Sequence, residues 1–488
     1  MKYRVNWLTP ILTAVVLFAC SLPAMSGEGG LSADNVAKIR ASFEMDRYNR
    51  AMYNAVTNNN LSKLALNRDI LREHNEIYSH KIKTKGITNQ KSSGRCWLFS
   101  SLNMFRPVVI DKYNLDNFEF SQNYLAFWDK MEKSNTFLEF VIEMRDRDTF
   151  DRELSEILRH PIGDGGYWSY TVELIKKYGA VPKEIMPETN SSGNTGEMNN
   201  ILERKLRTGA AAIRKMHQAG RPVKELRAEK DKILADVYKI LIVNLGEPPT
   251  EFVWRYEIRD TTKTDTDTTA DSTANANIDN RLIVAGTYTP KKFFEEVVAV
   301  DLDQYVNIFD NPTREYNNHF VASMARNMYD GKDLEYVSVP VENLKAIAMK
   351  SILNDDPVLF ACDVGKDQDR EDGIMAMNIY DYGTVFNTDL SMSKADMCNY
   401  YESTSNHMML MIGVDILNDK PVKWQVENSW GDKNGSSGYW AMYNDWFGAY
   451  VYSVIVKKEY VPEEILKLYD KKPIVLPVWD PNTLMIRN

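Results

Sequence analysis

The pattern of hydrophobic positions predicts a helix that begins at a cysteine. After Cys96, apolar residues recur at steps of four, three and four, at Leu98, Leu102, Phe105 and Val109. These steps follow the helical period and place the four side chains on one face. A thiol at a helix N-terminus lies at the positive end of the helix dipole, beside unpaired N–H groups, and both favour the thiolate. We therefore expect Cys96 to be a nucleophile with a lowered pKa.

The later part of the chain has the pattern of β-strands. Apolar and polar residues alternate over 422–427, which predicts a half-buried strand. Residues 408–414 form an apolar run, and residues 451–456 are another strand candidate. Because the helical patterns come early and the strand patterns come late, we expect an α+β architecture of two parts, with the site between them.

A helical hairpin is predicted between the two patterns. Apolar residues fall at helical spacing from Leu226 to Ile240, and the segment Gly220–Pro222 separates the two helices. Between Arg204 and Lys232, Lys and Arg outnumber Asp and Glu. A solvated helix face is the favoured interpretation of this basic character. Residues 260–280 contain almost no apolar side chains, which is typical of a mobile surface loop.

Length and charge narrow the class of protein. The chain has 488 residues, more than one compact core usually takes, so we expect two or three packed subdomains. Hydrophobic residues make up 44% and charged residues 26%, as in ordinary globular proteins. The formal net charge of −9 argues against nucleic acid or an anionic membrane as a partner of the whole surface.

The first 26 residues have the layout of a secretory signal. Lys2 and Arg4 precede a mostly apolar run over residues 8–22, and mostly small residues follow at 24–27. We expect a secreted or periplasmic protein from this layout. A membrane anchor is one alternative, although the apolar run is short for a span. Lipidation at Cys20 is another, because the residues before it resemble a bacterial lipobox.

The number and spacing of the remaining cysteines do not indicate a disulfide framework. Cys96, Cys362 and Cys398 are odd in number and lack the C-x-x-C spacing. This argues against a disulfide network and against a structural zinc site, and we expect neither a metal nor an organic cofactor. A single cysteine with a chemical role becomes the better hypothesis, although a buried inert thiol is the usual state of any one cysteine.

A base and an orienting residue for Cys96 are present in the sequence. Among the six histidines, only His407 precedes an apolar strand-like run, and Asn428 ends the alternating strand 21 residues later. An Asn there can fix the imidazole ring, and Trp430 can shield that hydrogen bond from water. Gln90, six residues before Cys96, can donate to an oxyanion. His407 alone would be read as a buried histidine, but the three features together favour catalysis.

An ordered set of motifs resembles one family. These motifs are Gln90–Ser100, Phe118–Tyr124, Phe127–Lys130, Asp164–Trp168, Lys177–Lys183, Cys362–Lys366, Val426–Gly431 and Leu476–Pro481. Together they resemble the papain superfamily of cysteine peptidases, and more closely its bleomycin hydrolase and bacterial aminopeptidase C branch. The resemblance covers roughly residues 60–488.

The resemblance implies an α+β, papain-like fold of two lobes, one helical and one β-barrel-like, with a helical insertion. Papain-like chains usually place the histidine about 130–150 residues after the cysteine. Here the separation is 407 − 96 = 311 residues, which leaves room for the insertion. The predicted segments are a signal peptide (1–26), an N-terminal helical arm (27–83), a helical catalytic lobe (84–197), a helical hairpin (198–250), a linker loop (251–280), a β-rich catalytic lobe (281–474) and a C-terminal arm in the cleft (475–488).

The resemblance also implies roles for individual residues. Gln90 matches the oxyanion-hole residue, Cys96 the nucleophile, His407 the base, Asn428 the orienter and Trp430 the shielding tryptophan.

Three further expectations come from the resemblance alone. Gly165 and Gly166 match paired glycines that let a substrate backbone approach closely. The arm from Trp479 to Asn488 is expected in the cleft, with the carboxylate of Asn488 meeting the α-ammonium of the substrate. The family also implies a homohexamer. The residue before His407 is Asn406, where the family usually has Thr.

The leading functional hypothesis is a cysteine aminopeptidase that acts on peptides by acyl transfer. A cysteine endopeptidase is the alternative if the arm does not block the cleft. A catalytically weak assembly that binds peptides or nucleic acid through the basic hairpin is the alternative from another class. The presence of Cys96, His407 and Asn428 favours the enzyme.

Overall fold

A computed structural model describes residues 29–259 and 281–481 of the chain. The predicted signal peptide with Cys20, the loop 260–280 and Asn488 lie outside these ranges. The chain divides into two compact units at Leu64 and Ala65. The described part of the first unit is helical, with α1 (Ala33–Ala41) and α2 (Arg47–Asn58) each capped by an acceptor side chain. The second unit contains every residue of the candidate site described below.

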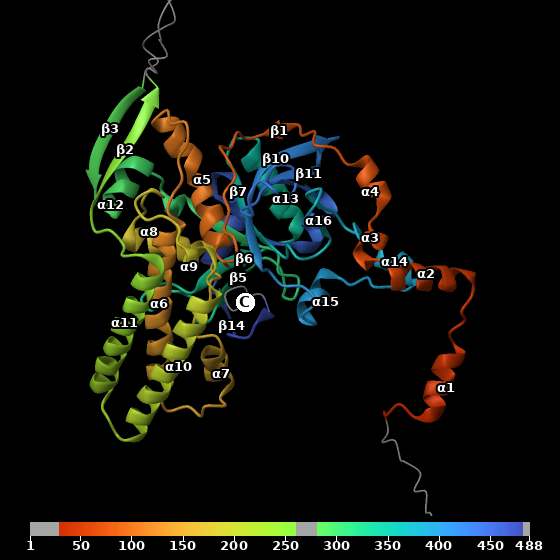
Figure 1. Ribbon diagram of the computed structural model, residues 1–488, viewed down its shortest axis with the longest axis horizontal. Helices are drawn as coiled ribbons and strands as arrows, with labels where there is room; N and C mark the ends of the chain where they lie inside the picture. The colour runs from red at the N-terminus through yellow and green to blue at the C-terminus, as the bar shows by residue number, and fades with distance from the viewer. Residues whose placement is uncertain (1–28, 260–280, 482–488) are drawn as a thin grey trace, which may run out of the picture. The chain divides into compact units, whose positions relative to one another are not determined.

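The helical side of the second unit is built around α5. Its helices are α5 (Cys96–Lys112), α6 (Gln122–Glu143), α7 (Arg152–Arg159), α8 (Trp168–Tyr178), α9 (Asn190–Gly193), α10 (Gly196–Gln218) and α11 (Val223–Leu245). The predicted apolar face of α5 is fully buried, in agreement with its spacing. α6, α10 and α11 lie side by side as long helices in Figure 1.

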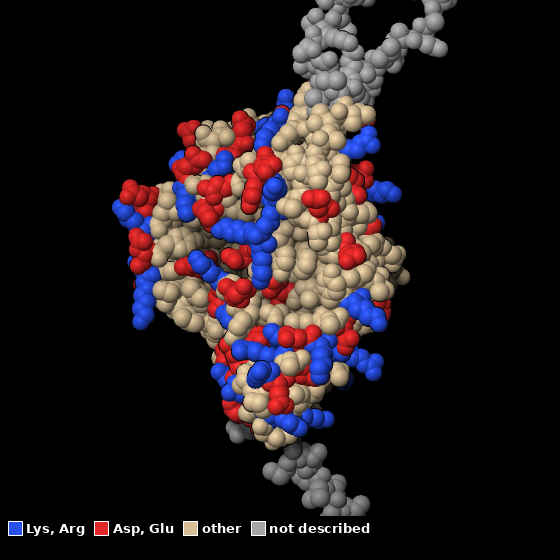
Figure 2. All heavy atoms as spheres, turned by 90° about the vertical axis from the view of Figure 1, so that its left-hand side faces the viewer, with Lys and Arg blue, Asp and Glu red and all other residues tan. Residues whose placement is uncertain are grey.

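The hairpin of α10 and α11 packs tightly and carries mixed charge. A side chain at Gly209 would meet Ile233 at 2.7 Å, so glycine allows the two helices to approach. The basic side chains of the hairpin are largely paired with acids, as Lys230 is with Glu139 of α6 at 2.7 Å. On the face in Figure 2, blue and red side chains are interspersed. This pattern fits a solvated surface better than a nucleic-acid site.

The strand side is one mixed sheet. Along it the order is β14-β5-β6-β4-β13-β7-β10-β11-β12-β9-β8, with β1 added to β10. The strands are β1 (His80–Lys81), β4 (Tyr305–Phe309), β5 (Asn318–Ala322), β6 (Leu334–Ser338), β7 (Val358–Cys362), β8 (Gln368–Asp369), β9 (Ile374–Met375), β10 (His407–Leu417), β11 (Lys420–Glu427), β12 (Tyr439–Tyr443), β13 (Val451–Lys457) and β14 (Ile474–Leu476). Helices of this side include α13 (Val341–Ile352), α15 (Lys394–Asn399) and α16 (Asn444–Tyr450).

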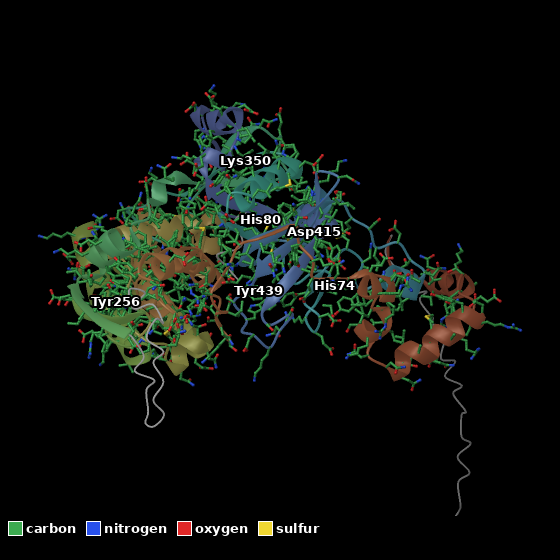
Figure 3. The ribbon with its side chains drawn as sticks, turned by 90° about the horizontal axis from the view of Figure 1, so that it is seen from above. His74, His80, Tyr256, Lys350, Asp415 and Tyr439 are labelled. Carbon is green, nitrogen blue, oxygen red and sulfur yellow. The ribbon has the colours of Figure 1, made fainter. Side chains whose placement is uncertain are left out.

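Strand β10 is buried on both faces, which explains its continuous apolar run. Met408, Leu410 and Ile412 belong to the core that includes α5, whereas Met409 and Met411 belong to the core beneath α13. A strand in this position holds its first residue rigidly. At the other end, β1 pairs with β10, and Ser79 Oγ donates to Asp415 Oδ1 at 3.0 Å. Seen from above, His80 and Asp415 lie close together (Figure 3).

The predicted linker 251–280 is wrong over its first part. Residues 252–259 form strand β2 (Phe252–Arg259), which pairs antiparallel with β3 (Arg281–Tyr288). Phe252 and Trp254 are buried while Val253 and Arg255 are exposed, so the segment has the alternation of a half-buried strand. Among the described helices, none is long and apolar enough to cross a membrane.

Candidate active site

The fold brings Cys96, His407 and Asn428 together from three elements. Cys96 is the first residue of α5, His407 is the first residue of β10, and Asn428 directly follows β11. Pairing of β10 with β11 places the last two side by side. The N–H of Met408 lies within hydrogen-bond range of the Cys96 thiol, so the thiol meets the start of β10. All three side chains are buried, with exposed fractions of 5%, 4% and 1%.

The imidazole ring of His407 is held from two directions. Its Nε2 lies 2.9 Å from Asn428 Oδ1, which also accepts from the N–H of Ser429 at 2.7 Å. An amide oxygen can only accept, so Nε2 carries the proton and Nδ1 is the nitrogen that remains for proton transfer. The ring of Trp430 lies 4.9 Å from the His407 ring, and Arg370 lies over the indole at 4.9 Å. The indole of Trp430 therefore packs against the imidazole of His407.

Burial determines the protonation of the pair. It raises the pKa of Cys96 to about 11, against the N–H groups of Met408, Trp97 and Cys96 that favour the thiolate. It lowers the pKa of His407 to about 4, with Arg370 acting in the same direction and Asn428 against it. The prediction of a lowered thiol pKa is therefore wrong for this structure, because loss of water outweighs the helix N-terminus. Burial thus favours the neutral form of each of the two side chains.

Gln90 is fixed next to the Asn428 segment. Its backbone N–H donates to Ser429 O at 2.8 Å, and its Oε1 accepts from Ser429 Oγ at 2.6 Å. Its Nε2 donates to Ser93 O at 2.6 Å. A primary amide carries two N–H bonds, so one is committed to Ser93 and the second can donate to a substrate oxygen. Lys91 has a φ of 53°, which turns the chain sharply after Gln90.

The two glycines lie against the start of α5. Trp97 Nε1 donates to Asp164 O at 2.7 Å, and a side chain at Gly166 would meet the Trp97 ring at 2.5 Å. Gly166 therefore lacks a side chain because the indole occupies that space. The carbonyl of Gly165 accepts from Lys133 Nζ at 2.6 Å. The role of Lys133 could not be found from the sequence, since it lies on α6, 32 positions away.

A buried carboxylate beneath the cysteine loop was also missed. Asp164 accepts from the N–H of Gly94 at 2.9 Å, Lys130 Nζ at 2.6 Å, Asn199 Nδ2 at 2.9 Å and the Thr195 hydroxyl. Burial alone would raise its pKa, but the charge and hydrogen bond of Lys130, with the other donors, hold the pKa well below its usual range. Asp164 thus ties the Cys96 loop to the glycine segment.

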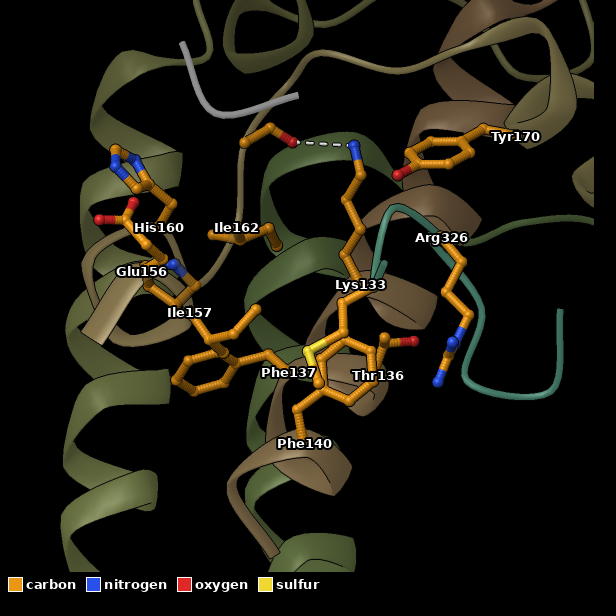
Figure 4. A pocket seen from close by; sticks show the side chains of 13 residues that line it. Lys133, Thr136, Phe137, Phe140, Glu156, Ile157, His160, Ile162, Tyr170 and Arg326 are labelled. Atoms are coloured by element: carbon orange, nitrogen blue, oxygen red, sulfur yellow. Dashed lines mark hydrogen bonds between the residues drawn. The ribbon is translucent and has the colours of Figure 1, made fainter. Parts of the chain in front are cut away.

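A small apolar cavity adjoins the glycine segment (Figure 4). Its volume is about 70 Å³, and its walls include Phe137, Phe140, Ile157 and Ile162. Lys133 lies at its edge and donates to Gly163 O at 3.1 Å. The cavity is therefore larger than the volume that one water molecule needs, which is roughly 10–15 Å³.

The C-terminal segment is anchored close to His407. Thr404 Oγ1 donates to Pro481 O at 3.2 Å, and Arg314 donates to the buried carboxylate of Asp480 at 2.7 Å. The guanidinium of Arg152 lies 4.1 Å from the ring centre of Trp479. The last described residue, Pro481, is therefore bonded to Thr404, which lies three residues before His407 in the sequence. Within residues 29–259 and 281–481, no group of His, Cys, Asp and Glu side chains is placed to hold a metal ion.

Comparison with known proteins finds relatives that match nearly the whole chain. Aminopeptidase C of Lactobacillus helveticus is 36% identical over 460 residues, which cover 92% of this chain and 97% of that protein. Bleomycin hydrolase of Rattus norvegicus is 34% identical over 464 residues, which cover 93% and 98%. The crystal structure of PepW from Lactobacillus rhamnosis HN001 is 36% identical and superposes with a TM-score of 0.85, covering 92% of this chain and 98% of that one.

The fold is therefore that of a papain-like cysteine peptidase, α+β with a helical and a strand-rich side. The Peptidase C1-like family matches residues 30–483, and the chain belongs to this family.

Proposed function

We propose that this chain, a cysteine-type aminopeptidase, releases N-terminal residues from peptides through the thiol of Cys96. The observation that supports this assignment most strongly is the hydrogen bond between His407 Nε2 and Asn428 Oδ1, beside a thiol at a helix N-terminus. In this arrangement one imidazole nitrogen is oriented and the other remains for proton transfer.

The reaction begins from the neutral pair. As Cys96 Sγ attacks the first peptide carbonyl carbon, its proton passes to His407 Nδ1, so charge forms only when substrate is in place. The carbonyl oxygen becomes an oxyanion, to which the second N–H of Gln90 and the backbone N–H of Cys96 can donate. The tetrahedral intermediate then breaks the C–N bond, and His407 gives its proton to the leaving amine.

Water completes the cycle. His407 takes a proton from the water as its oxygen attacks the thioester carbon of the acyl-enzyme. The C–S bond breaks, the released amino acid leaves with its new carboxyl group, and the proton returns to Cys96. No residue outside Cys96, His407, Asn428 and Gln90 needs to change its bonds or hydrogen bonds in these steps.

Restriction to N-terminal residues is assigned to the segment after Pro481. Thr404 and Arg314 hold Pro481 and Asp480, and Thr404 is three residues before His407. We propose that the residues after Pro481, which lie outside the described part of the chain, leave room for one substrate residue, and that the carboxylate of Asn488 meets its α-ammonium. Gly165 and Gly166 are proposed to border the substrate backbone on the other side. If the segment does not limit the cleft, an endopeptidase results.

The test compares two fluorogenic substrates, an amino-acid amide with a free α-amine and its N-acetylated twin. We expect cleavage of the first only, and loss of activity in Cys96→Ser. Cys398→Ser is the matched control, because Cys398 is also a buried thiol but lies on α15 beside Tyr452. Cleavage of the acetylated substrate would support the endopeptidase. If the wild-type protein cleaves neither substrate, the peptidase assignment is rejected.

Export and assembly are proposed on narrower grounds. We infer export from the signal-like sequence of residues 1–26, with lipidation of Cys20 as the alternative. A homohexamer is proposed from the family resemblance alone. The intact mass of the protein from its native host separates cleavage from lipidation, and light scattering gives the number of subunits.

A further inference from the structure

A buried polar cluster joins the three segments that carry the site. Asn103 lies on α5, seven residues after Cys96 and therefore about two turns further on the same side of the helix. Its Nδ2 donates to Thr88 Oγ1 at 2.8 Å and to Glu427 Oε1 at 3.0 Å. The exposed fractions of Asn103, Thr88 and Glu427 are 5%, 3% and 3%.

Each member of the cluster lies on the same chain segment as a site residue. Glu427 is the residue before Asn428, at the end of β11. Thr88 O accepts from the N–H of Gly431 at 3.0 Å, and Thr88 is two residues before Gln90. Asn103 is rigidly connected to Cys96 through the helix. One amide group therefore couples the nucleophile, the oxyanion donor and the orienter.

We infer that Glu427, Asn103 and Thr88 form a positioning cluster for the active site, and that the ionised form of Glu427 holds the aligned geometry. This inference rests on the proposed function. None of the three side chains touches the reacting atoms, so they are positioning residues rather than catalytic ones. Their effect is to fix the separation of α5 from the ends of β10 and β11.

The surroundings of Glu427 make its charge state sensitive to pH. Arg106 of α5 is the charged group that acts on it, and the N–H groups of Arg106 are directed to backbone carbonyls such as Phe118 O at 3.0 Å and to Asn103 Oδ1 at 3.5 Å. Thr84 donates to the carboxylate from the preceding loop, and Tyr439 faces it from β12, where Figure 3 labels it. On β10 its partner is the apolar Leu410.

Burial is the largest influence on this carboxylate and raises its pKa to about 7, while Arg106, Thr84 and Asn103 act against burial. Protonation near neutral pH removes the charge that draws the donors of Asn103 and Thr84 inward. Activity should therefore rise with pH through about 7, in addition to the separate loss near pH 4 that protonation of His407 causes.

Glu427→Gln tests the inference, because it keeps the shape of the side chain and removes its charge. We expect kcat above pH 7 to fall by roughly 10- to 100-fold, the size of effect that small misplacement of reacting groups causes. KM should stay unchanged, and the step in kcat near pH 7 should disappear. Glu139→Gln is the matched control, since Glu139 is equally buried but bonds Lys230 and Arg227 of the hairpin. It should keep the wild-type profile.

A second readout separates this inference from the proposed function. The rate at which iodoacetamide alkylates Cys96 needs no peptide, and its pH profile should show the same step near 7 in wild type and lose it in Glu427→Gln. If Glu427→Gln does not fold, Thr88→Val, which removes one acceptor of Asn103, should show the same fall in kcat at constant KM. The inference would be overturned if Glu427→Gln, or Thr88→Val, kept the wild-type kcat together with an unmoved step in kcat near pH 7. A wild type that alkylates with the expected step but cleaves no peptide would reject the function alone.

Discussion

Two buried carboxylates border the site, one on the helical side and one on the strand side, and their pKa values are shifted in opposite directions. Asp164 receives four hydrogen bonds, one of them from the buried ammonium of Lys130. Glu427 receives hydrogen bonds from neutral donors, and Arg106 acts on it only through its charge. Burial opposes ionisation at both positions.

At Asp164 the directly bonded Lys130 and the neutral donors outweigh burial, whereas at Glu427 burial outweighs the neutral donors and the charge of Arg106. Asp164 is a permanent anion that ties the Cys96 loop to Gly165 and Gly166. Glu427 can change its charge near neutral pH beside Asn428. The helical side of the site is thus fixed, and the strand side can respond to pH.

The largest effect is expected at Asp164. In Asp164→Asn the ammonium of Lys130 stays buried without its counter-ion, and breaking a buried pair in this way costs about 3–5 kcal/mol. The free energy of unfolding, measured in denaturant at pH 7, should fall by this amount. Asp164→Asn with Lys130→Met should recover part of the loss. An Asp164→Asn variant as stable as wild type would show that the pair is not the anchor.

The opposite sign is expected for the stability of Glu427→Gln. A raised carboxyl pKa means that the unfolded chain loses its proton first, so wild-type stability falls as pH rises from about 4.3 to about 7. Above pH 7, Glu427→Gln should exceed wild type by roughly 3 kcal/mol at most, although its kcat is lower.

Below pH 4 the Glu427→Gln variant and the wild type should be equally stable. For Asp164, with its lowered pKa, the contribution to stability is present above about 3.9 and is lost as pH falls further. Thermal unfolding across pH 3–9 measures both trends. A Glu427→Gln variant that is less stable than wild type at pH 8 would contradict the raised pKa.

The smallest effect is expected at Arg370, which faces His407 across Trp430. Burial is the main cause of the low pKa of His407, and Arg370 adds to it. Arg370→Gln should therefore move the acidic limb of kcat/KM from about pH 4 to slightly higher pH. Lys366→Gln is a suitable control, because Lys366 pairs with Glu402 at 2.6 Å. An acidic limb that moves to lower pH would contradict the sign of the Arg370 contribution.

Local patterns predict the parts of this structure that depend on local sequence. The spacing after Cys96 predicts α5, and the alternation before Asn428 predicts β11, because each reflects one buried face. The helix start at Cys96, the strand-like run after His407 and the strand end at Asn428 also predict which residues meet. The residues that position them could not be predicted, since Asn103 and Glu427 are 324 positions apart and Lys133 meets Gly165 from another helix.

The protonation of the site was mispredicted for the same reason. A helix N-terminus is a local feature and favours the thiolate, whereas the burial that opposes it comes from the packing of β10 and α5 together. Similarly, β2 over 252–259 depends on pairing with residues 281–288, beyond a long polar stretch. Long-range pairing decides such features, and composition alone suggested a linker.

The acyl-enzyme itself tests the central claim most directly. Wild-type protein mixed with a peptide that carries a free α-amine, quenched in acid within milliseconds and measured by intact mass, should carry one aminoacyl residue. Fragmentation should place that residue on Cys96, and Cys96→Ser should carry none. A longer peptidyl adduct on Cys96 would contradict restriction to the N-terminal residue, and an aminoacyl group on any other residue would contradict the nucleophile.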